Sequence, residues 1–277
     1  MTAVIEVDNL LKQYKKATSP AVAGVSFQVA EGELFAFLGP NGAGKTTTIS
    51  ILTTTLNKTS GTVRIAGYDV TTQDLKVREH IGVIAQKPSL DTSLTAEQNI
   101  RIHACLYGLY GYRPTFALMP RDYRERVQQL ADVVGIGDSL STKVSKLSGG
   151  MARKLEIVRS LIHTPHVLFL DEPTQGLDAV ARHDLWHYID RVRREWGTTV
   201  FLTTHYIDEA ESADRVCLIN HGRIALCCPP EEMKHRFGAD TLEDAYVDFL
   251  RQDDASWADA HKTGRSGSHE TKQEAAV

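Results

Sequence analysis

Short apolar runs alternate along the chain with segments that have the spacing of helices. Val4–Val7, Val22–Val29 and Leu34–Leu38 are predicted strands, and the last is apolar throughout, which is typical of a strand buried on both faces. A glycine-rich turn follows, then a predicted helix over Thr46–Leu56 and a predicted strand over Thr62–Ile65. Strands that alternate with helices in this way predict an α/β fold.

The pattern becomes mainly helical over residues 95–163. Apolar residues at helical spacing predict a helix over Tyr123–Val134, and Ser148 is a candidate N-cap for the helix after it. Strand patterns return at His166–Leu170 and Thr199–Thr203. The helical stretch is therefore predicted to be an insertion within a sheet domain.

Composition and charge narrow the class of protein. The 277 residues are 42% hydrophobic and 24% charged, which excludes wholesale disorder. A net charge of −4 gives no general attraction to nucleic acid, so no nucleic-acid partner is expected. No apolar run approaches the roughly 18–20 residues of a membrane span, and the N-terminal segment carries acids where a signal peptide carries basic residues. We therefore expect a cytoplasmic protein, and four cysteines without a CxxC pair suit that compartment.

The strongest local motif is G-x-x-x-x-G-K-[ST] over Gly39–Thr46, between a predicted buried strand and a predicted helix. Its glycines let consecutive backbone N–H groups face a phosphate, and the next helix adds its positive N-terminal end. Lys45 is placed to neutralise the β- and γ-phosphates, and the Thr46 hydroxyl to bind Mg²⁺. The motif predicts a nucleoside triphosphate site but leaves open how the energy is used.

Two acids follow the apolar run Val167–Leu170. A buried strand that runs toward the phosphate loop would place Asp171 and Glu172 at its carboxyl end, where ligands bind in open α/β sheets. Asp171 then suits Mg²⁺, bound through water, and Glu172 lies beyond the metal, where it can polarise the attacking water. Alone, such a pair is more often a solvated turn, but its place after a phosphate loop favours the functional interpretation.

Three further motifs narrow the family. Leu147–Met151 (LSGGM) precedes the Asp-Glu strand, and His205 ends the predicted strand Thr199–Thr203. Gln86 follows the apolar stretch Ile81–Ile84. In this order and spacing, together with the phosphate loop, the set resembles the ATP-binding cassette, the nucleotide-binding subunit of ABC transporters. The resemblance covers residues 4–230. It implies a phosphate-loop (P-loop) NTPase fold with a RecA-like core, an N-terminal antiparallel β subdomain and an inserted α-helical subdomain.

The resemblance also divides the chain. Residues 1–88 together with 165–230 are expected to form the nucleotide-binding core with the β subdomain, and residues 89–164 the helical signature subdomain. Residues 231–250 are expected to form a C-terminal helical extension. The polar tail over residues 251–277 is predicted to be disordered. The stretch Tyr107–Pro120 either contacts a partner or covers the helical subdomain.

The resemblance implies a role for each site residue. Tyr14 occupies the place of the aromatic residue that stacks on adenine, and His205 that of the histidine that holds the γ-phosphate. The expected ligands are ATP and Mg²⁺. The residues expected to contribute to catalysis are Glu172, His205 and Lys45, and those expected to hold Mg²⁺ are Thr46, Gln86 and Asp171. The residues expected to contact nucleotide are Tyr14, Gly39, Pro40, Asn41, Gly42, Ala43, Gly44, Lys45, Thr46, Thr47, Gln86, Ser148, Gly149, Gly150 and Asp178.

The signature Leu147–Met151 is expected to act on a second chain. Ser148–Gly150 before a helix is an anion-binding geometry in its own right, and one chain thus carries two separate phosphate sites. Two chains that pair head to tail, each completing the other's site, explain both. The resemblance implies that Ser148 and Gly150 bind the γ-phosphate held by the opposite subunit and that Asp178 links the two sites. A homodimer is the simplest arrangement, and a different second cassette is the alternative.

Met151 stands where the commonest signature has glutamine, and it cannot supply an amide hydrogen bond to ribose. Methionine at this place is familiar in cassettes that resemble the daunorubicin-resistance branch of drug exporters. Thr241–Tyr246 resembles the short motif that closes cassettes of that branch, although an acidic amphipathic helix gives the same pattern. Both features favour export as the direction of transport.

The sequence therefore predicts an ATPase subunit that powers a membrane exporter. A separate transmembrane permease would supply the path and dock near Gln86 and the helical insertion, so the chain is expected to be peripheral on the cytoplasmic face of the cell membrane. The alternative is a soluble cassette ATPase in translation, repair or regulation. Such proteins usually carry tandem cassettes, a long coiled-coil insertion or zinc-binding cysteines, and this sequence shows one cassette without those features.

Overall fold

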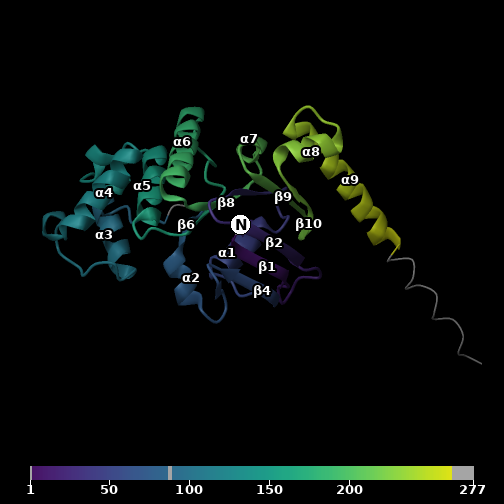
Figure 1. The fold of residues 1–277 in the computed structure, drawn as a ribbon, viewed down its shortest axis with the longest axis horizontal. Coiled ribbons are helices and arrows are strands. Elements are labelled where there is room, and N and C mark those ends of the chain that lie inside the picture. Colours follow the sequence, from purple (N-terminus) through teal and green to yellow (C-terminus); the bar gives the residue numbers. More distant parts are fainter. Residues whose placement is uncertain (1, 87–88, 264–277) are drawn as a thin grey trace, which may run out of the picture. The chain divides into compact units, whose positions relative to one another are not determined.

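The computed structural model describes residues 2–86 and 89–263, and Figure 1 shows its helices and strands. The chain divides into two compact units, Met1–Cys227 and Cys228–Val277, which are described in turn. In residues 2–86 and 89–263, no helix is both long and apolar enough to cross a membrane.

The first unit is built on a six-stranded sheet. Its strand order is β10-β9-β3-β8-β7-β6, and β3 pairs in parallel with β8 and β9, as does β7 with β6 and β8. Parallel pairing brings the carboxyl ends of these strands to one edge of the sheet. The strands are β3 (Leu34–Leu38), β6 (Ile81–Ile84), β7 (Val167–Asp171), β8 (Thr199–Thr204), β9 (Arg215–Asn220) and β10 (Arg223–Cys228).

A second, four-stranded sheet has the order β2-β1-β4-β5, and its pairs are antiparallel. The core lies between the two sheets, where Phe27 of β2 stacks on Phe35 of β3 with ring centroids 5.5 Å apart. Phe27 also contacts Phe37 and Phe201, and all four rings are buried. These strands are β1 (Ala3–Lys12), β2 (Val22–Ala30), β4 (Ser60–Ile65) and β5 (Tyr68–Asp69).

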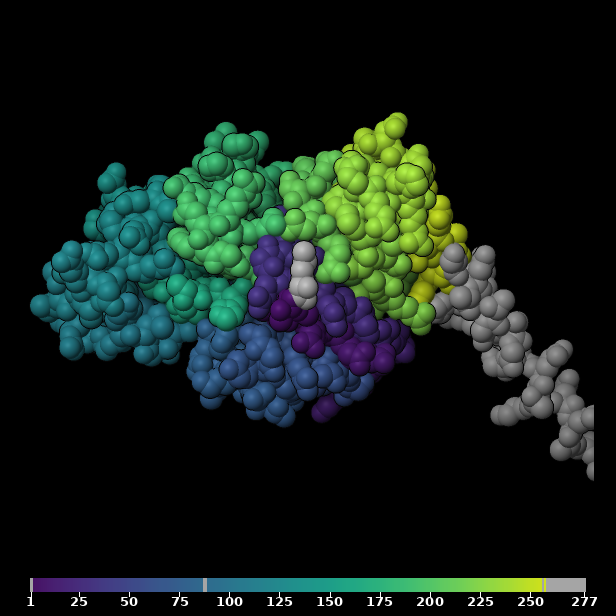
Figure 2. Space-filling model, viewed as in Figure 1, coloured from purple at the N-terminus to yellow at the C-terminus, as the bar shows by residue number. Residues whose placement is uncertain are grey.

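The described residues between β6 and β7 include the α-helices α3, α4 and α5, and Figure 2 shows this part of the chain as a lobe on the left of the first unit. Buried Tyr123 and Val127 of α4 and buried Leu155 and Val158 of α5 supply the apolar interior of this lobe. A capping box begins α3 at Thr95. The helices of the first unit are α1 (Lys45–Leu52), α2 (Asp74–His80), α3 (Ala96–Leu106), α4 (Arg121–Val133), α5 (Gly149–Leu161), α6 (Ala179–Trp196) and α7 (Ile207–Glu211).

The α/β fold with parallel and antiparallel sheets confirms the predicted fold class. β3 begins and ends where the apolar run predicts, at Leu34 and Leu38. Helix α1 is shorter than predicted and ends at Leu52, because the chain turns at Thr54, whose φ is +61°. After α3 the chain has only a short 3₁₀ turn, Phe116–Leu118, before α4, as expected for a segment rich in glycine, tyrosine and proline.

The second unit contains α8 (Pro230–Phe237) and α9 (Leu242–Thr263). Gly238 ends α8 in the left-handed conformation, and the Phe237 and Phe249 rings meet with centroids 6.4 Å apart. The predicted disorder from residue 251 onward is wrong up to Thr263, where α9 continues. Residues 251–263 contain neither glycine nor proline, so nothing in them breaks a helix. Residues 264–277 lie outside the described part of the chain.

Candidate functional site

The phosphate loop joins the end of β3 to the start of α1 and requires glycine at two places. A Cβ on Gly39 would lie 2.2 Å from the carbonyl oxygen of Ile219. Gly44, the residue before α1, has φ +108°, and a Cβ there would lie 2.5 Å from the carbonyl oxygen of Ala21. The loop is therefore packed against its neighbours, and only glycine fits at these positions.

Lys45 is buried at the start of α1, with 4% of its surface exposed. Its Nζ donates hydrogen bonds to the carbonyl oxygens of Gly39 (2.6 Å) and Pro40 (3.1 Å), so it folds back over the loop. Burial lowers the pKa of Lys45, and the nearby charges of Glu172 and Asp171 oppose that shift. The ammonium group is thus held over the phosphate loop by carbonyl oxygens, and the loop's N–H groups are the ones that can bind an anion.

A small cavity of about 150 Å³ joins the loop to Glu172. Its position between the loop backbone and Glu172 suits phosphate groups. It is lined by Ala21, Asn41, Gly42, Gly44, Lys45, Thr46, Thr47 and Glu172.

Asp171 ends β7, and its carboxylate is buried beside β8. Thr203 Oγ1 donates a hydrogen bond to Asp171 Oδ1 at 2.5 Å. Burial raises the pKa of Asp171, the Thr203 hydrogen bond opposes that shift, and the charge of Glu172 adds to it. A cation near Asp171 would favour its charged form.

Glu172 follows β7 in the left-handed region of the backbone, with φ +46°, which is uncommon for a residue with a side chain. Its N–H donates to the carbonyl oxygen of Thr203 at 3.0 Å, which holds this turn against β8. Only 7% of Glu172 is exposed. The uncommon backbone conformation and the bond to β8 therefore fix the buried Glu172 carboxylate at the carboxyl edge of the sheet.

Side chains from three other elements surround the Glu172 carboxylate. Gln86, after β6, donates from Nε2 to Glu172 Oε2 at 3.2 Å. His205 Nδ1, after β8, lies 3.2 Å from Oε1, although it does not have the geometry of a hydrogen bond. Lys45 Nζ lies 3.9 Å from the same oxygen. The structure thus brings together four predicted residues that are far apart in the sequence.

Tyr14 lies beside the phosphate loop. Its hydroxyl is 3.5 Å from Thr47 Oγ1, and 43% of the residue is exposed. Lys12 Nζ lies 5.2 Å from the centre of the ring. An exposed aromatic face next to the loop can stack on a base whose phosphates lie in the loop.

The signature residues begin α5. Ser148 is the N-cap, and its hydroxyl accepts a hydrogen bond from the Met151 N–H at 3.2 Å. Ser148 and Gly149 are exposed, and a Cβ on Gly149 would meet nothing within 4 Å. Among the described residues, the side chains that contact the Glu172 carboxylate are Gln86, His205 and Lys45, and Ser148–Gly150 are not among them. This helix end is therefore open.

Asp178 caps α6, and its carboxylate accepts a hydrogen bond from the Ala181 N–H at 2.8 Å. A Cβ on Gly150 would lie 3.3 Å from the Ala181 Cβ, so the starts of α5 and α6 are neighbours. Asp178 is thus a helix cap that lies close to the signature residues.

Two polar residues of the site were not predicted. Thr203 bonds Asp171, and Gln175 accepts a hydrogen bond from Gln86 Nε2 at 2.8 Å. Thr203 lies within a predicted strand, and only its pairing opposite Asp171 in the parallel sheet reveals its contact. No local motif could have identified either residue.

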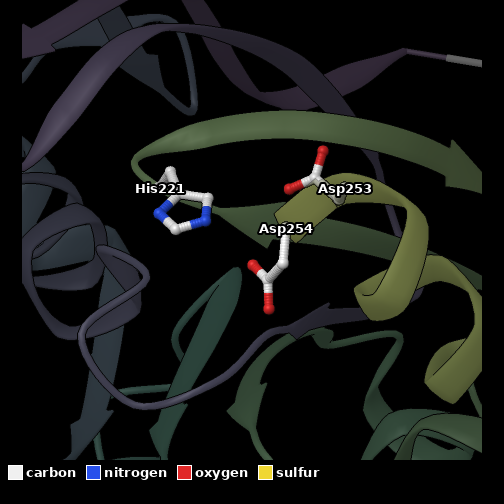
Figure 3. Close-up of side chains that lie close together, drawn as sticks. All are labelled: His221, Asp253 and Asp254. Carbon is white, nitrogen blue, oxygen red and sulfur yellow. The ribbon is translucent and has the colours of Figure 1, made fainter. Parts of the chain in front are cut away.

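His221, Asp253 and Asp254 are drawn in Figure 3. His221 lies in the turn between β9 and β10 of the first unit, and the two aspartates lie on α9 of the second. Imidazole and carboxylate groups are metal-ligand types, but these three belong to different units, and we assign no site to them.

Comparisons with known proteins agree with this geometry. Residues 22–175 match the family described as "ABC transporter". The chain is 40% identical to the daunorubicin/doxorubicin resistance ATP-binding protein of Streptomyces peucetius, over 87% of this chain and 70% of that protein. It is 38% identical to the Nod factor export ATP-binding protein I of Ralstonia nicotianae, over 90% and 74% of the two chains.

Solved structures show the same fold. The solved structure of the ATP binding subunit of an ABC transporter matches this chain with a TM-score of 0.77 and 28% identity, over 89% of this chain and 99% of that one. A dimeric ATP-binding cassette in a post-hydrolysis state, bound to ADP and Pi, matches with a TM-score of 0.71 and 26% identity, over 81% and 98%.

Proposed function

Since the chain belongs to the ABC transporter family and is an ATP-binding subunit that hydrolyses ATP, we propose that it powers an exporter. The ATPase activity on which this proposal depends is supported by the contacts of Lys45, Gln86 and His205 with the carboxylate of Glu172. Export is supported by relatives named for drug resistance and for Nod factor export. It is also supported by Met151 and by Thr241–Tyr246.

ATP binding is assigned to the loop and its neighbours. The loop N–H groups and the start of α1 hold the β- and γ-phosphates, and Lys45 exchanges its carbonyl partners for phosphate oxygens. Tyr14 stacks on the adenine of a nucleotide whose phosphates lie in the loop. The contacts of Tyr14 with Thr47 and Lys12 support this placement.

The residues near Asp171 fit Mg²⁺. A hydroxyl, an amide oxygen and a carboxylate are the hard oxygen ligands that Mg²⁺ takes, and Thr46, Gln86 and Asp171 offer them. Burial raises the pKa of the Asp171 carboxyl, and a bound cation would favour its charged form, as the charges of Lys45 and Arg153 already do. When bound, Mg²⁺ would neutralise charge on the β- and γ-phosphates.

Hydrolysis is assigned to Glu172. Its carboxylate accepts a proton from water as the water oxygen bonds to the γ-phosphorus, and the bond between that phosphorus and the β–γ bridging oxygen breaks to leave ADP and phosphate. Gln86 orients one carboxylate oxygen. His205 lies beside the other and is placed to hold the γ-phosphate.

Two cassettes complete the sites. The exposed start of α5, with Ser148, Gly149 and Gly150, can bind the γ-phosphate held by a second chain, and Asp178 lies beside it. A homodimer is the simplest pairing, and a different second cassette is the alternative. Loss of the γ-phosphate on hydrolysis then loosens the pair.

A separate transmembrane permease is the proposed membrane partner. It would dock near Gln86 and the helical lobe, so the chain would be peripheral on the cytoplasmic face of the membrane. We retain the division into a nucleotide-binding core (1–88 and 165–230), a helical subdomain (89–164) and a C-terminal extension (from residue 231) as part of this proposal. The net charge of −4 supports a partner other than nucleic acid.

The test is to tag the chain at its natural level, crosslink it in native cells and identify its neighbours in the membrane fraction by mass spectrometry. Recovery with a multi-helix membrane protein is the expected result, and that protein would lead to the transported substrate. Recovery only from the soluble fraction, with ribosomes or repair proteins, would replace export by the soluble cassette role and leave the ATPase chemistry unchanged.

A further inference from the structure

Arg153 lies on α5, one turn after the signature residues, and is 5% exposed. Its Nε donates a hydrogen bond to the Pro173 carbonyl oxygen at 2.9 Å, and its Nη1 donates to the Ala85 carbonyl oxygen at 2.6 Å. Pro173 follows Glu172 and Ala85 precedes Gln86 in the sequence. One guanidinium group therefore holds the two backbone segments that carry Glu172 and Gln86.

Glu156 and Arg159, further along α5, contact Ser89, which lies three residues after Gln86 in the sequence. Glu156 Oε1 accepts a hydrogen bond from the Ser89 N–H at 3.0 Å. Arg159 donates to the Ser89 carbonyl oxygen at 2.8 Å and to its hydroxyl at 2.6 Å. Glu156, 1% exposed, also pairs with Arg153 at 2.8 Å, so these contacts form one network that is buried at Arg153 and Glu156 and reaches the surface at Ser89.

The network belongs to the helix that starts with the signature. Ser148 caps α5, and Arg153 is on the same helix. Because a helix moves as a rigid element, a displacement of its start would move the groups that hold Gln86 and Glu172. The network thus provides a physical connection between the start of α5 and the chain's own hydrolytic site.

We propose that Arg153 and Glu156 are positioning residues that hold Gln86 and Glu172 in place for hydrolysis. This inference rests on the proposed roles of Gln86 and Glu172. The alternative is that the pair only stabilises the fold. A buried ion pair is weak support for stability, because apolar residues of similar size are often as stable or more so. The contacts to Ala85, Pro173 and Ser89, which an apolar pair could not make, favour positioning.

The decisive variant is Arg153→Met with Glu156→Leu in the full-length chain. Either change alone would leave a buried charge unpaired, whereas the double variant removes both charges and separates folding from positioning. We expect the double variant to fold with an ATP KM close to that of the parent and with kcat lower by about 10- to 100-fold, as for a misplaced active-site group. The backbone groups that lose their partners should lower its melting temperature without preventing folding. A stable double variant with unchanged kcat would overturn the proposal.

The matched control is Arg121→Met with Glu125→Leu, which removes an exposed pair from α4 in the same lobe. It should leave kcat unchanged. Should the buried double variant fail to fold, Arg153→Lys is the second variant. Lysine keeps the charge beside Glu156, but its single ammonium cannot span the Ala85 and Pro173 carbonyl oxygens as the guanidinium does.

A second measurement asks whether Arg153 acts through Gln86. Arg153→Lys should lower kcat by a smaller factor in a Gln86→Ala background than in the parent chain, because only its hold on the Glu172 segment then remains. Independent, multiplicative losses would overturn action through Gln86. Glu172→Gln is run beside these variants. If that variant keeps normal turnover, the proposed role of Glu172 fails; if it loses turnover while the Arg153 variants do not, only the positioning role fails.

Discussion

Thr203 and Asp171 are opposite each other on β8 and β7, and the threonine hydroxyl donates a 2.5 Å hydrogen bond to the aspartate carboxylate. Asp171 is the carboxylate that we propose for Mg²⁺. Its pKa is raised mainly by burial, and the Thr203 hydrogen bond is the largest effect that opposes the shift. A strand residue outside every motif thus helps to keep the proposed metal ligand charged.

Thr203→Val should make ATP turnover more sensitive to acid. Valine has the same shape but no donor, so the pKa of Asp171 would rise further and its charged form would be lost at a higher pH. We expect the acidic limb of the rate profile to move to higher pH. The Mg²⁺ concentration for half-maximal turnover should rise about three- to tenfold. Thr203→Ser retains the hydroxyl and is the control; equal profiles for all three proteins would contradict this role.

Asp171→Asn should stabilise the fold while it removes Mg²⁺-dependent turnover. A carboxyl whose pKa is raised on folding favours the folded state below its unfolded pKa, and that contribution is lost as the pH rises through the folded pKa. At neutral pH the buried charge is therefore a net cost, which asparagine removes. A gain of 1 kcal/mol would raise the melting temperature by about 2–4 °C. Exposed Asp138→Asn is the control; a lower melting temperature for Asp171→Asn would count against this reasoning.

The sequence predicted most of what lies next to a motif. The buried strand Leu34–Leu38, the loop Gly39–Thr46 and the N-cap Ser148 are found where their residue types predict them. The family and its drug-exporter branch were also identified from short motifs, and the comparisons confirm both. Local chemistry fixes these features, because each depends on residues within a few positions of one another.

Contacts across the sheet could not be predicted in the same way. Thr203 meets Asp171 only because β8 lies between β3 and β7, an order that differs from the order in the sequence. Arg153 reaches Ala85 from the helical lobe, at a separation of 68 residues. The helix beyond residue 251 was missed because its polar composition hides a run without helix breakers.

Ser148→Arg should prevent two chains from closing while each chain still binds ATP. Ser148 is exposed, and its side chain bonds the Met151 N–H of its own helix, so a bulky cation there should leave the phosphate loop intact. Titration with a fluorescent ATP analogue should give an affinity close to that of the parent, whereas ATP should no longer produce a dimer in size-exclusion chromatography. Ser148→Ala, which loses the cap but adds no bulk, is the control. An ATP-dependent dimer of the arginine variant would contradict the role of this surface.

Met151→Gln should keep ATP turnover within about tenfold of the parent, since one neutral hydrogen bond is worth roughly 0.5–1.5 kcal/mol. The backbone N–H of residue 151, which bonds the Ser148 hydroxyl, is unchanged by the substitution. Steady-state turnover at saturating ATP is the measurement. A larger loss would show that the Met151 side chain has a packing role in addition to its place in the signature.

The most direct test of the whole account is the behaviour of Glu172→Gln with ATP and Mg²⁺. The substitution keeps an oxygen for the Gln86 hydrogen bond but removes the group that accepts the proton from water. Binding of ATP should be unchanged, turnover should fall by orders of magnitude, and the chain should accumulate as an ATP-bound dimer in size-exclusion chromatography. Normal turnover by this variant, or its persistence as a monomer with ATP bound, would contradict a hydrolytic site built on Glu172 and completed by a second chain.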